Sequence, residues 1–527
     1  MVLPHRRAWL TLAALACGVS LLAQPLTVTI LHTNDSHARV EPATSGGQEI
    51  GGRSRLVSAA LSELAVAENP LVLDAGDVFQ GTLYFNVYEG LADLAVMNYL
   101  GYDAMAVGNH EFDRGDGPLA EFARLAQFPL LAANLDVSGN EKLKDLIKPS
   151  TVVEVDGQSI GIIGAVTADL PTISSMPDTV KMRPLRESIQ EEINRLTADG
   201  VNKIVVVAHV GWREEAELIA GIRGIDVLVG GHSHSLLGTF DRPIPGNPTP
   251  MDASYPVRRV GADGRPVLHV TAWEWSKVLG KLIVTFDENG YVSAVGEESK
   301  PIVIDNSFPK DPYVETLIAA FRRPIVELAN REIGNVPTLI ERGNHLQGES
   351  AMGNLIADAM REATKVNGSV AAFMNAGGIR AQFEAGPLTF GEAVTVQPFA
   401  NTLTILDLTG AQLKAALEHG VRLMPEASGA LLHPSAGTSY RVDPSKPAGQ
   451  RVFDVIVAGE PLDLDKTYRL TFNSFTAGGG DAHEVLKGAT GYRYDTGLID
   501  LDALTEYIKK QNGVVAAKVE GRIRVGS

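Results

Sequence analysis

Five short apolar runs in the first half of the chain each end directly in side chains that bind divalent cations. The runs are residues 26–31, 71–73, 104–107, 203–208 and 225–229. Runs of this length are typical of buried strands, and segments with apolar residues at helical spacing lie between them, so the pattern predicts an α/β or mixed-sheet (α+β) fold. Because ligands bind beyond the carboxyl ends of strands in open α/β sheets, the five clusters can converge on one point.

The side chains that follow the runs are imidazoles, carboxylates and one amide. The seven candidate ligands are Asp35, His37, Asp77, Asn109, His209, His232 and His234. This set suits Zn, Mn, Fe or Co, and the absence of thiolates indicates a catalytic site that holds water rather than a closed structural site. Seven ligands are too many for one tetrahedral ion but suit two ions that share a carboxylate, which can hold a hydroxide and clamp a phosphoryl group for in-line attack.

Each of these residues also has a simpler interpretation when it is taken alone. A histidine such as His209 after a strand is more often a loop or core residue, and Asp77 can be a turn residue or a helix cap. His232 and His234 can belong to a surface turn. Independent polar residues are not expected at the same end of five successive strands, so their conjunction favours the metal site.

Composition excludes several other classes of protein. The 527 residues include 46 Lys and Arg against 63 Asp and Glu, a net charge of −17. This opposes binding of a nucleic acid polymer, which needs a basic surface. With 45% hydrophobic and 21% charged residues, the chain should form globular cores, and at roughly 100–200 residues per domain it should form two or three domains. The body of the chain lacks cysteine, which excludes disulfides and thiolate metal sites there.

The first 23 residues have the organisation of a secretory signal. His5, Arg6 and Arg7 precede an uncharged run at residues 8–23, and cleavage is expected after Ala23. Small residues before Cys17 also allow the alternative of a lipoprotein with a lipid anchor at Cys17. No other stretch approaches the roughly 20 apolar residues of a membrane span, so we expect a periplasmic or secreted protein. We also expect it to be a monomer that binds a small nucleotide.

The rest of the chain divides into two expected domains, residues 24–301 and 334–527, joined by residues 302–333. Expected helices of the first domain are 55–66, 91–100, 186–196 and 214–222, with strands at 267–271 and 279–286 and a loop at 242–258. The connection should contain one long helix at 313–333, in which Pro324 should cause a kink or start a new turn. In the second domain we expect helices at 351–363 and 410–419 and strands at 371–374, 402–408, 452–457 and 468–473.

Four strings of residues resemble a known family. They are His-Thr-Asn-Asp-Ser-His (32–37), Asp-Ala-Gly-Asp (74–77), Gly-Asn-His-Glu-Phe-Asp (108–113) and Gly-Gly-His-Ser-His (230–234). In this order they resemble the calcineurin-like metallophosphoesterases, and the first and third resemble the secreted 5′-nucleotidase / UDP-sugar hydrolase family. The resemblance implies an N-terminal metallophosphoesterase β-sandwich flanked by helices, a connecting helix, and a C-terminal mixed α/β nucleotide-binding domain.

The resemblance also implies how the ligands divide between two divalent ions, for which Zn, Mn or Co are expected. One ion would take Asp35, His37, Asp77 and His234, and the other would take Asp77, Asn109, His209 and His232. Asp77 would be the bridge. Many family members carry an amide at the position of His234, so the identity of the first ion stays open.

His110 is implied to face the phosphate rather than to bind a metal. A protonated imidazole can stabilise the charge of a pentacoordinate transition state, and Asp113 three residues later can orient that ring and raise its pKa. The alternative is that Asp113 caps the next helix.

Three strings in the second half suggest a binding site for a nucleoside. They are Asn-Ala-Gly-Gly-Ile-Arg (375–380), Gln-Pro-Phe-Ala-Asn (397–401) and Phe-Thr-Ala-Gly-Gly-Gly-Asp (475–481). Glycines such as Gly378 let the backbone approach a ligand, Arg380 offers a planar fork, and two aromatic rings suit a nucleobase. The resemblance implies that Phe399 and Phe475 sandwich the base and that Asn375, Arg380, Asn401 and Asp481 bind polar atoms, with Asp481 on the ribose. The alternative is that both phenylalanines are core residues.

One stretch departs from the family. Its members usually carry one or two phosphate-binding arginines just before the helix that begins Met-Gly-Asn-Leu, but residues 341–350 offer only Arg342 and His345, at other offsets. The preference among mono-, di- and cyclic nucleotides therefore stays open.

The expected function is a secreted dimetal nucleotide phosphohydrolase that acts on 5′-monophosphates or UDP-sugars, with a hinge in residues 302–333. The alternatives are a 2′,3′-cyclic nucleotide phosphodiesterase with 3′-nucleotidase activity, another phosphoesterase, or a catalytically silent nucleoside-binding module.

Overall fold

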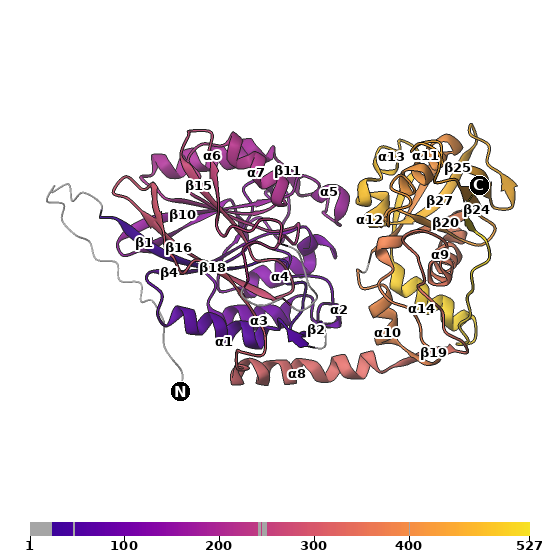
Figure 1. Cartoon of the computed structure of the whole chain (residues 1–527), viewed down its shortest axis with the longest axis horizontal. Helices are drawn as coiled ribbons and strands as arrows, with labels where there is room; N and C mark the ends of the chain where they lie inside the picture. The colour runs from indigo at the N-terminus through magenta and orange to yellow at the C-terminus, as the bar shows by residue number, and fades with distance from the viewer. Residues whose placement is uncertain (1–23, 46–47, 241–243, 245–249, 400, 527) are drawn as a thin grey trace.

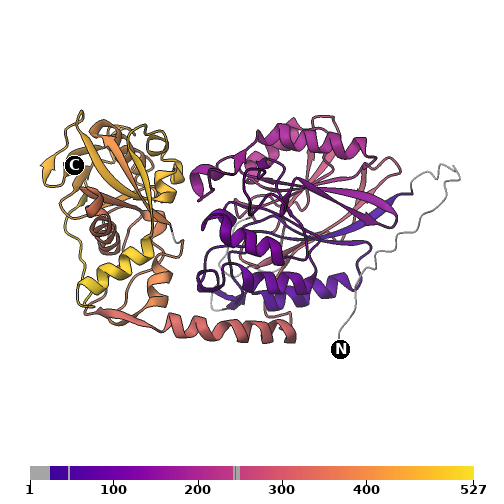
Figure 2. The same ribbon diagram turned by 180° about the vertical axis from the view of Figure 1, so that it is seen from behind.

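The computed structural model describes residues 24–526 apart from residues 46–47, 241–243, 245–249 and 400. The expected leader with Cys17, and part of the expected loop at 242–258, lie outside the described residues. The described chain forms two lobes that helix α8 (Pro312–Ala329) connects along one side, as Figure 1 and the reverse view in Figure 2 show. Within the described ranges no helix has the length and apolar character needed to cross a membrane.

The N-terminal lobe is a sandwich of two sheets. In spatial order the first contains β17 (Val292–Val295), β16 (Val278–Phe286), β1 (Leu26–Thr33), β4 (Pro70–Asp74), β5 (Ala104–Ala106), β6 (Leu130–Leu131) and β8 (Ile147–Lys148), and β18 (Lys300–Val303) also pairs with β16. The second contains β14 (Val257–Val260), β15 (Pro266–Thr271), β13 (Val227–Gly230), β12 (Ile204–His209), β10 (Gln158–Val166) and β9 (Ser150–Val155). Side chains of both sheets, such as Ile30 and Val207, pack together between them. The predicted β-sandwich is confirmed.

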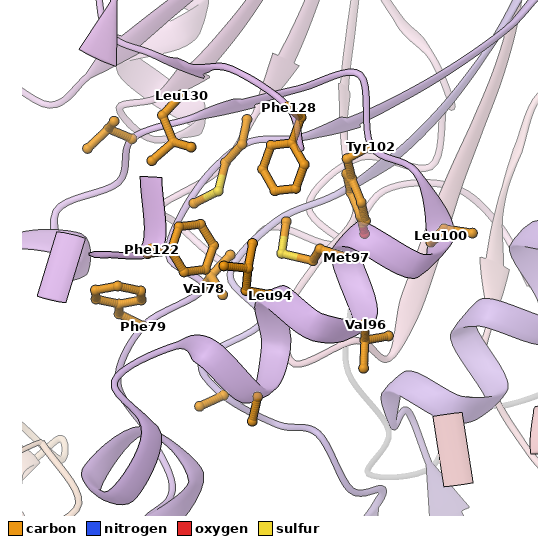
Figure 3. Packing of buried hydrophobic residues seen from close by; sticks show 14 of the residues in the cluster. Val78, Phe79, Leu94, Val96, Met97, Leu100, Tyr102, Phe122, Phe128 and Leu130 are labelled. Carbon is orange, nitrogen blue, oxygen red and sulfur yellow. The ribbon is translucent and has the colours of Figure 1, made fainter. Parts of the chain in front are cut away.

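Helices cover both outer faces of the sandwich, as predicted. They are α1 (Arg53–Leu64), α2 (Leu83–Tyr88), α3 (Leu91–Leu100), α4 (Asp116–Leu125), α5 (Leu170–Ile173), α6 (Leu185–Ala198) and α7 (Trp212–Gly221). Helices α1, α3 and α4 pack on the first sheet, and α6 and α7 pack on the second. Figure 3 shows part of the first of these cores, where Phe79, Met97, Phe122 and Phe128 lie together. Two small antiparallel pairs, β2 (Ala43–Ser45) with β3 (Gln48–Ile50) and β7 (Leu135–Asp136) with β11 (Lys181–Met182), lie outside the sandwich sheets.

The connecting helix α8 begins with two strong start signals. The side chain of Asp311 accepts hydrogen bonds from the backbone N–H groups of Tyr313 and Val314, and Pro312 occupies the first turn. The helix continues through Pro324 but ends at Ala329, so the prediction that it reaches residue 333 is wrong. The reason is tertiary: residues from Glu332 onward pair with a second strand of the C-terminal lobe.

The C-terminal lobe is also mixed α/β. A central sheet contains β23 (Leu432–Pro434), β20 (Ala371–Asn375), β27 (Thr467–Asn473), β22 (Thr402–Thr409) and β28 (Arg493–Ile499). Smaller sheets contain β26 (Glu460–Pro461), β25 (Val452–Val457), β24 (Ser439–Val442) and β29 (Ile523–Val525), and the pair β19 (Glu332–Val336) and β21 (Gly386–Thr389). Its helices are α9 (Ala351–Thr364), α10 (Phe390–Val396), α11 (Gly410–Gly420), α12 (Ser474–Ala477), α13 (Glu484–Lys487) and α14 (Asp500–Lys510).

Candidate active site

The ends of five strands bring the seven predicted ligands together. Strands β1, β4 and β5 are parallel neighbours in one sheet, and β12 and β13 are parallel neighbours in the other. His209 is the last residue of β12, and the other ligands follow their strands within four residues. The predicted ligands supply two groups of atoms that lie within 4.8 Å of one another, Asp35, His37 and His234, and Asp77, His209 and His232. His110 forms a third such group with His37 and Asp77.

Two carboxylates lie between these groups. Asp77 Oδ2 is 3.0 Å from His209 Nε2 and 3.9 Å from His37 Nε2, so it faces both groups. Asp35 Oδ1 is 3.3 Å from His234 Nε2 and 4.0 Å from His209 Nε2. Asn109 is buried nearby, and its amide oxygen has no hydrogen-bond partner among the described residues. Asp77 and Asp35 therefore each face imidazoles of both groups.

The hydrogen bonds of the imidazoles show that the site fits metal ions. His37 and His209 each donate from Nδ1 to a backbone carbonyl, at 3.1 and 2.7 Å, and His234 Nδ1 donates to Glu274 Oε2 at 2.7 Å. In the neutral rings each Nε2 then carries a lone pair. Yet the Nε2 atoms of His37 and His234 are 3.1 Å apart, and His209 Nε2 faces a carboxylate. The lone pairs of His37 and His234 repel each other, and the lone pair of His209 repels the carboxylate, unless a positive charge lies between them.

The pKa values at the centre lead to the same conclusion. Burial lowers the pKa of His209, but Asp77 and Asp35 outweigh burial and raise it to about 10. Burial lowers the pKa of His37 to about 3. The carboxylates therefore require a positive charge, which a proton on His209 supplies when no cation is bound and a metal ion supplies when one is.

The backbone at the ligands is strained. The φ angles of Asp35, His37, Asp77, His232 and His234 are 48°, 50°, 58°, 72° and 48°. The left-handed region is uncommon for residues other than glycine, and such conformations persist only where the surroundings hold them in place. The turns after the strands are therefore tightly specified.

Buried side chains hold these turns. The carboxylate of Glu111 accepts hydrogen bonds from the backbone N–H groups of residues 77, 78, 79 and 108 at 2.6 to 3.1 Å, which fixes the turns that carry Asp77 and Asn109. Glu215 Oε1 accepts from the N–H groups of residues 211 and 231, both at 3.1 Å, beside His232.

His110 lies next to this centre and pairs with Asp113. Its Nδ1 is 2.6 Å from Asp113 Oδ2, and its Nε2 is 3.9 Å from Asp77 Oδ2. Gln80 and Ser174 also donate to the Asp113 carboxylate, at 3.1 and 2.9 Å. Burial lowers the pKa of His110, but Asp113 and Asp77 raise it to about 9. Asp113 does not cap α4, since that helix begins at Asp116 after Gly115, so the capping alternative is wrong.

The predicted substrate residues gather at one edge of the central sheet in the C-terminal lobe. Strands β20 and β27 are parallel and end there, and antiparallel β22 begins there. Asn375 Nδ2 donates to Asp481 Oδ2 at 2.9 Å, and the Arg380 guanidinium lies 5.7 Å from the centroid of the Phe399 ring. Phe399 and Phe475 are half-buried, which does not fit the alternative that they are core residues.

The two sets of residues line one cavity of about 450 Å³ between the lobes. The N-terminal lobe contributes Asn109, His110, Asp113 and His232, and the C-terminal lobe contributes Asn375, Gly378, Arg380, Phe399, Asn401, Phe475 and Asp481. Neither Arg342 nor His345 is among the described residues that line it. Arg342 instead donates to the backbone carbonyl of Arg380 at 2.9 Å, and His345 is 6% exposed.

The sequence reading missed several residues that support the site. Glu111 lies inside the string Gly-Asn-His-Glu-Phe-Asp (108–113), but only the folded structure shows that its carboxylate is buried beside backbone N–H groups. Glu274 lies between two tryptophans in a segment without a motif, and Gln80 and Ser174 are distant in sequence from their partner Asp113. The sequence offered at most one weak signal for such residues, namely an isolated acidic residue in an apolar segment.

Known proteins match most of the chain. A model of the calcineurin-like phosphoesterases matches residues 28–236, and a model of the 5′-nucleotidase C-terminal domain matches residues 332–488. A snake venom 5′-nucleotidase from Naja atra is 34% identical, over 94% of this chain and 98% of its own length. A trifunctional nucleotide phosphoesterase from Bacillus subtilis is 32% identical over 94% of this chain, which spans only 35% of that relative.

A solved structure is also similar along its full length. The crystal structure of a 5′-nucleotidase precursor from Thermus thermophilus has 42% sequence identity and a TM-score of 0.76, covering 95% of this chain and 100% of that one. Both lobes and their connection are thus shared with a solved protein.

Proposed function

This chain belongs to the 5′-nucleotidase family of metal-dependent phosphoric monoester hydrolases, and from that membership we propose that it removes the 5′-phosphate from nucleoside monophosphates. UDP-sugars are proposed as further substrates. The observation that carries the proposal is the single cavity that joins Asn109, His110 and His232 to Phe399, Phe475 and Asp481. A nucleotide held there places its base and its phosphate against different lobes.

We assign the ligands to two divalent ions, with Zn, Mn or Co as the expected metals. One ion would be held by Asp35, His37, Asp77 and His234 and the other by Asp77, Asn109, His209 and His232. When bound, such ions lower the pKa of a bound water and clamp a phosphoryl group. The unpartnered Asn109 Oδ1 and the converging lone pairs of His37 and His234 support this assignment.

Protein groups would then orient the substrate and stabilise charge. His110, kept protonated by Asp113, would hold its charged Nε2–H toward the phosphoryl oxygens where negative charge grows in the transition state. Phe399 and Phe475 would stack on the base, and Asn375, Arg380, Asn401 and Asp481 would bind polar atoms of the nucleoside and phosphate, with the backbone at Gly378 in close approach. In this arrangement the N-terminal lobe performs the chemistry and the C-terminal lobe selects the nucleotide.

A substrate panel on metal-reconstituted protein tests the proposal. Hydrolysis of AMP, UMP, UDP-glucose and 2′,3′-cyclic AMP is followed by chromatography of the nucleotide products, together with inorganic phosphate, after dialysis against chelator and addition of Mn²⁺ or Zn²⁺. We expect phosphate release from AMP and UMP that requires metal. Hydrolysis of the cyclic nucleotide alone would identify a 2′,3′-cyclic nucleotide phosphodiesterase instead, and no hydrolysis of any compound would identify a silent binding module.

We further propose domains at residues 24–301 and 334–527 and a hinge in the connection at 302–333. Helix α8 holds to the N-terminal lobe through contacts such as Tyr88 Oη to the Phe321 carbonyl at 2.9 Å. Between the lobes, Lys487 Nζ is 3.5 Å from Asp169 Oδ1. A cleavable thiol-reactive cross-linker between cysteines at these two positions should stop turnover until it is cleaved, because substrate could not enter. Full turnover in the cross-linked protein would contradict the hinge.

The location of the protein is proposed from residues 1–23. If they are a secretory leader, the mature chain is periplasmic or secreted, with or without a lipid on Cys17. Mass spectrometry of the mature N-terminus distinguishes a chain that begins at Gln24 from a lipidated one.

A further inference from the structure

His269 is a fully buried histidine of strand β15 that is not one of the proposed metal ligands. Burial lowers the pKa of His269 and outweighs Glu215, which raises it, so the ring is neutral near pH 7. Arg259 Nε donates to Nδ1 of the ring at 2.9 Å, and Nε2 lies 2.8 Å from Glu215 Oε2. A guanidinium can only donate, so Nδ1 accepts and Nε2 carries the proton. His269 therefore donates a hydrogen bond to the Glu215 carboxylate.

Trp212 packs over this pair. Its ring stacks on the ring of His269, with centroids 4.0 Å apart and planes inclined by 16°. The Arg259 guanidinium lies 4.8 Å from the centroid of the Trp212 ring. The backbone N–H of Trp212 donates to Ser233 Oγ at 2.9 Å, on the turn that carries the last two predicted ligands. The ring of His269 is thus held in one orientation by contacts at both of its nitrogens and on one face.

The carboxylate of Glu215 joins His269 to two of the predicted ligands. While Oε2 accepts from His269, Oε1 accepts from two backbone N–H groups, one two residues after His209 and one directly before His232, both at 3.1 Å. The two ligands follow or end the neighbouring strands β12 and β13. One carboxylate therefore links the two turns that carry His209 and His232.

Two glycines make room for this arrangement. A Cβ atom at Gly230 would lie 2.1 Å from Glu215 Oε2, and one at Gly231 would lie 2.9 Å from His209 Nδ1. A side chain at either position would displace the carboxylate or the imidazole. The glycines of the Gly-Gly-His string therefore admit Glu215 between the turns.

We propose that His269 is a positioning residue for the second of the two ions and that it acts through Glu215 on the turns that carry His209 and His232. Without the Nε2–H group, Glu215 Oε2 is buried without a donor, and the carboxylate can turn away from the backbone groups that it holds. The turns then lose their fixed separation. This inference rests on the proposed function, because it uses the assignment of His209 and His232 to one ion.

The first ion should depend on His269 much less. Three of its four proposed ligands, Asp35, His37 and Asp77, follow strands of the other sheet. The second ion takes His209 and His232, half of its proposed ligands, from the sheet that contains β15. Residues that orient metal ligands typically change metal affinity about 10–100-fold. A loss of this size should therefore appear at one ion and not at the other.

Titration of metal-free protein with Co²⁺ tests this difference, because Co²⁺ suits imidazole and carboxylate ligands and its visible absorption reports binding. His234→Ala removes a ligand of the first ion alone, so Co²⁺ then reports on the second, and His232→Ala does the reverse. His269→Phe keeps a ring against Trp212 but removes the N–H group. In His269→Phe we expect the Kd for Co²⁺ to rise about 10–100-fold in the His234→Ala background and at most about threefold in the His232→Ala background.

His269→Gln separates the hydrogen bond from the packing of the ring. Its amide can donate to Glu215, although it cannot stack on Trp212 as an imidazole does. We expect it to bind Co²⁺ within about threefold of the wild-type affinity. Excess metal should also restore the kcat of His269→Phe with AMP, because this variant binds an ion weakly but keeps every group proposed to contact the substrate.

His433→Phe is the matched control. His433 is also fully buried, and its Nε2 donates to the backbone carbonyl of His345 at 2.9 Å in the C-terminal lobe. This variant should keep the wild-type affinity for both ions. If His269→Phe does not fold, Arg259→Met replaces it, since loss of this donor lets the ring of His269 move its proton to Nδ1. Loss of one hydrogen bond should then raise the Kd of the second ion about 2–10-fold.

The outcomes separate this inference from the proposed function. Wild-type affinity in His269→Phe, equal losses in both backgrounds, or a loss in His269→Gln as large as in His269→Phe would overturn the positioning role and leave AMP hydrolysis by wild type intact. If wild type binds no Co²⁺, the metal assignment of the proposed function fails and this inference fails with it. If wild type binds two Co²⁺ ions but hydrolyses no nucleotide, only the substrate assignment fails, and the same titrations still decide the role of His269.

Discussion

The proposed metal centre and the proposed nucleoside-binding residues differ in how firmly the fold holds them. We call the latter the nucleoside cluster; its members are Asn375, Gly378, Arg380, Phe399, Asn401, Phe475 and Asp481. Asp35, Asp77 and His209 are at most 2% exposed and lie at the ends of strands buried within a sandwich. In the nucleoside cluster, Phe399 is half-buried and Arg380 is exposed, both on segments between elements, and Phe475 is half-buried in the four-residue helix α12. If the proposed roles hold, the comparison places the chemistry on a rigid frame and substrate choice on loops and a short helix that can change without loss of that frame.

We expect the largest loss of metal and turnover from Asp77→Asn, because the metal centre is the part of the site that the fold holds most firmly. The amide keeps the shape but removes the charge that both groups of ligands face. Metals supply several kcal/mol of transition-state stabilisation, so we expect bound metal to fall and kcat to drop about 10³–10⁴-fold. Elemental analysis and phosphate release from AMP measure both.

Asp226→Asn is the matched control for this change. Asp226 is also buried, and its Oδ2 accepts a hydrogen bond from the Ile204 N–H at 2.8 Å, away from the ligands. It should keep metal and turnover. Full metal content together with wild-type kcat in Asp77→Asn would remove the case for a shared carboxylate.

Substitutions of His110 and Asp113 separate stabilisation of transition-state charge from metal binding. His110→Ala should retain both metals yet lose about 10²–10³ in kcat, the usual size of an interaction with charge that develops in the transition state. Asp113→Asn should lose about 10–100-fold, because it acts by orienting the ring. Metal loss in His110→Ala would show that His110 is a ligand instead.

The nucleoside cluster predicts effects that depend on the substrate. Phe399→Ala and Phe475→Ala should each lower kcat/KM for AMP by about 5–100-fold, from stacking worth about 1–3 kcal/mol per base. p-Nitrophenyl phosphate carries no base, so its hydrolysis should fall much less. Phe453→Ala removes a half-buried ring from another face of the same lobe and should leave both substrates at wild-type rates. Equal losses on AMP and p-nitrophenyl phosphate would place the rings in the folded core rather than against the base.

The same contrast explains what could be predicted from the sequence. The positions of the metal ligands follow from strands, because parallel strands place their carboxyl ends at one edge whatever lies between them. The strands themselves end where their partners end: β1 continues to Thr33 because Thr33 pairs with Asp74 of β4. Strand and helix ends were therefore displaced by one or two residues, and the helix expected at 313–333 was cut short by a strand pair in the other lobe.

Residues that act through other residues were not predictable. Glu274 orients His234 only because the fold brings the segment after β15 beside the loop after β13. Such roles depend on several distant segments at once, and a single sequence carries no signal for them.

The smallest predicted effect tests whether the two regions are coupled. Ser174 Oγ donates to Asp113 Oδ1 at 2.9 Å, and Ser174 directly follows α5, which contacts α12 beside Phe475. In Figure 1 these two helices face each other across the lobes. The position of α12 can therefore affect the orientation of the His110 ring through Ser174 and Asp113.

Ser174→Ala should lower kcat for AMP about 2–10-fold, the equivalent of one hydrogen bond of about 0.5–1.5 kcal/mol, and should lower hydrolysis of p-nitrophenyl phosphate less. Ser175→Ala is the control, since Ser175 lines the same cavity and makes no bond to Asp113 in the described structure. Equal losses on the two substrates would confine Ser174 to the metal centre. A loss that appears only with AMP would show that a nucleotide bound at the nucleoside cluster affects His110 at the metal centre.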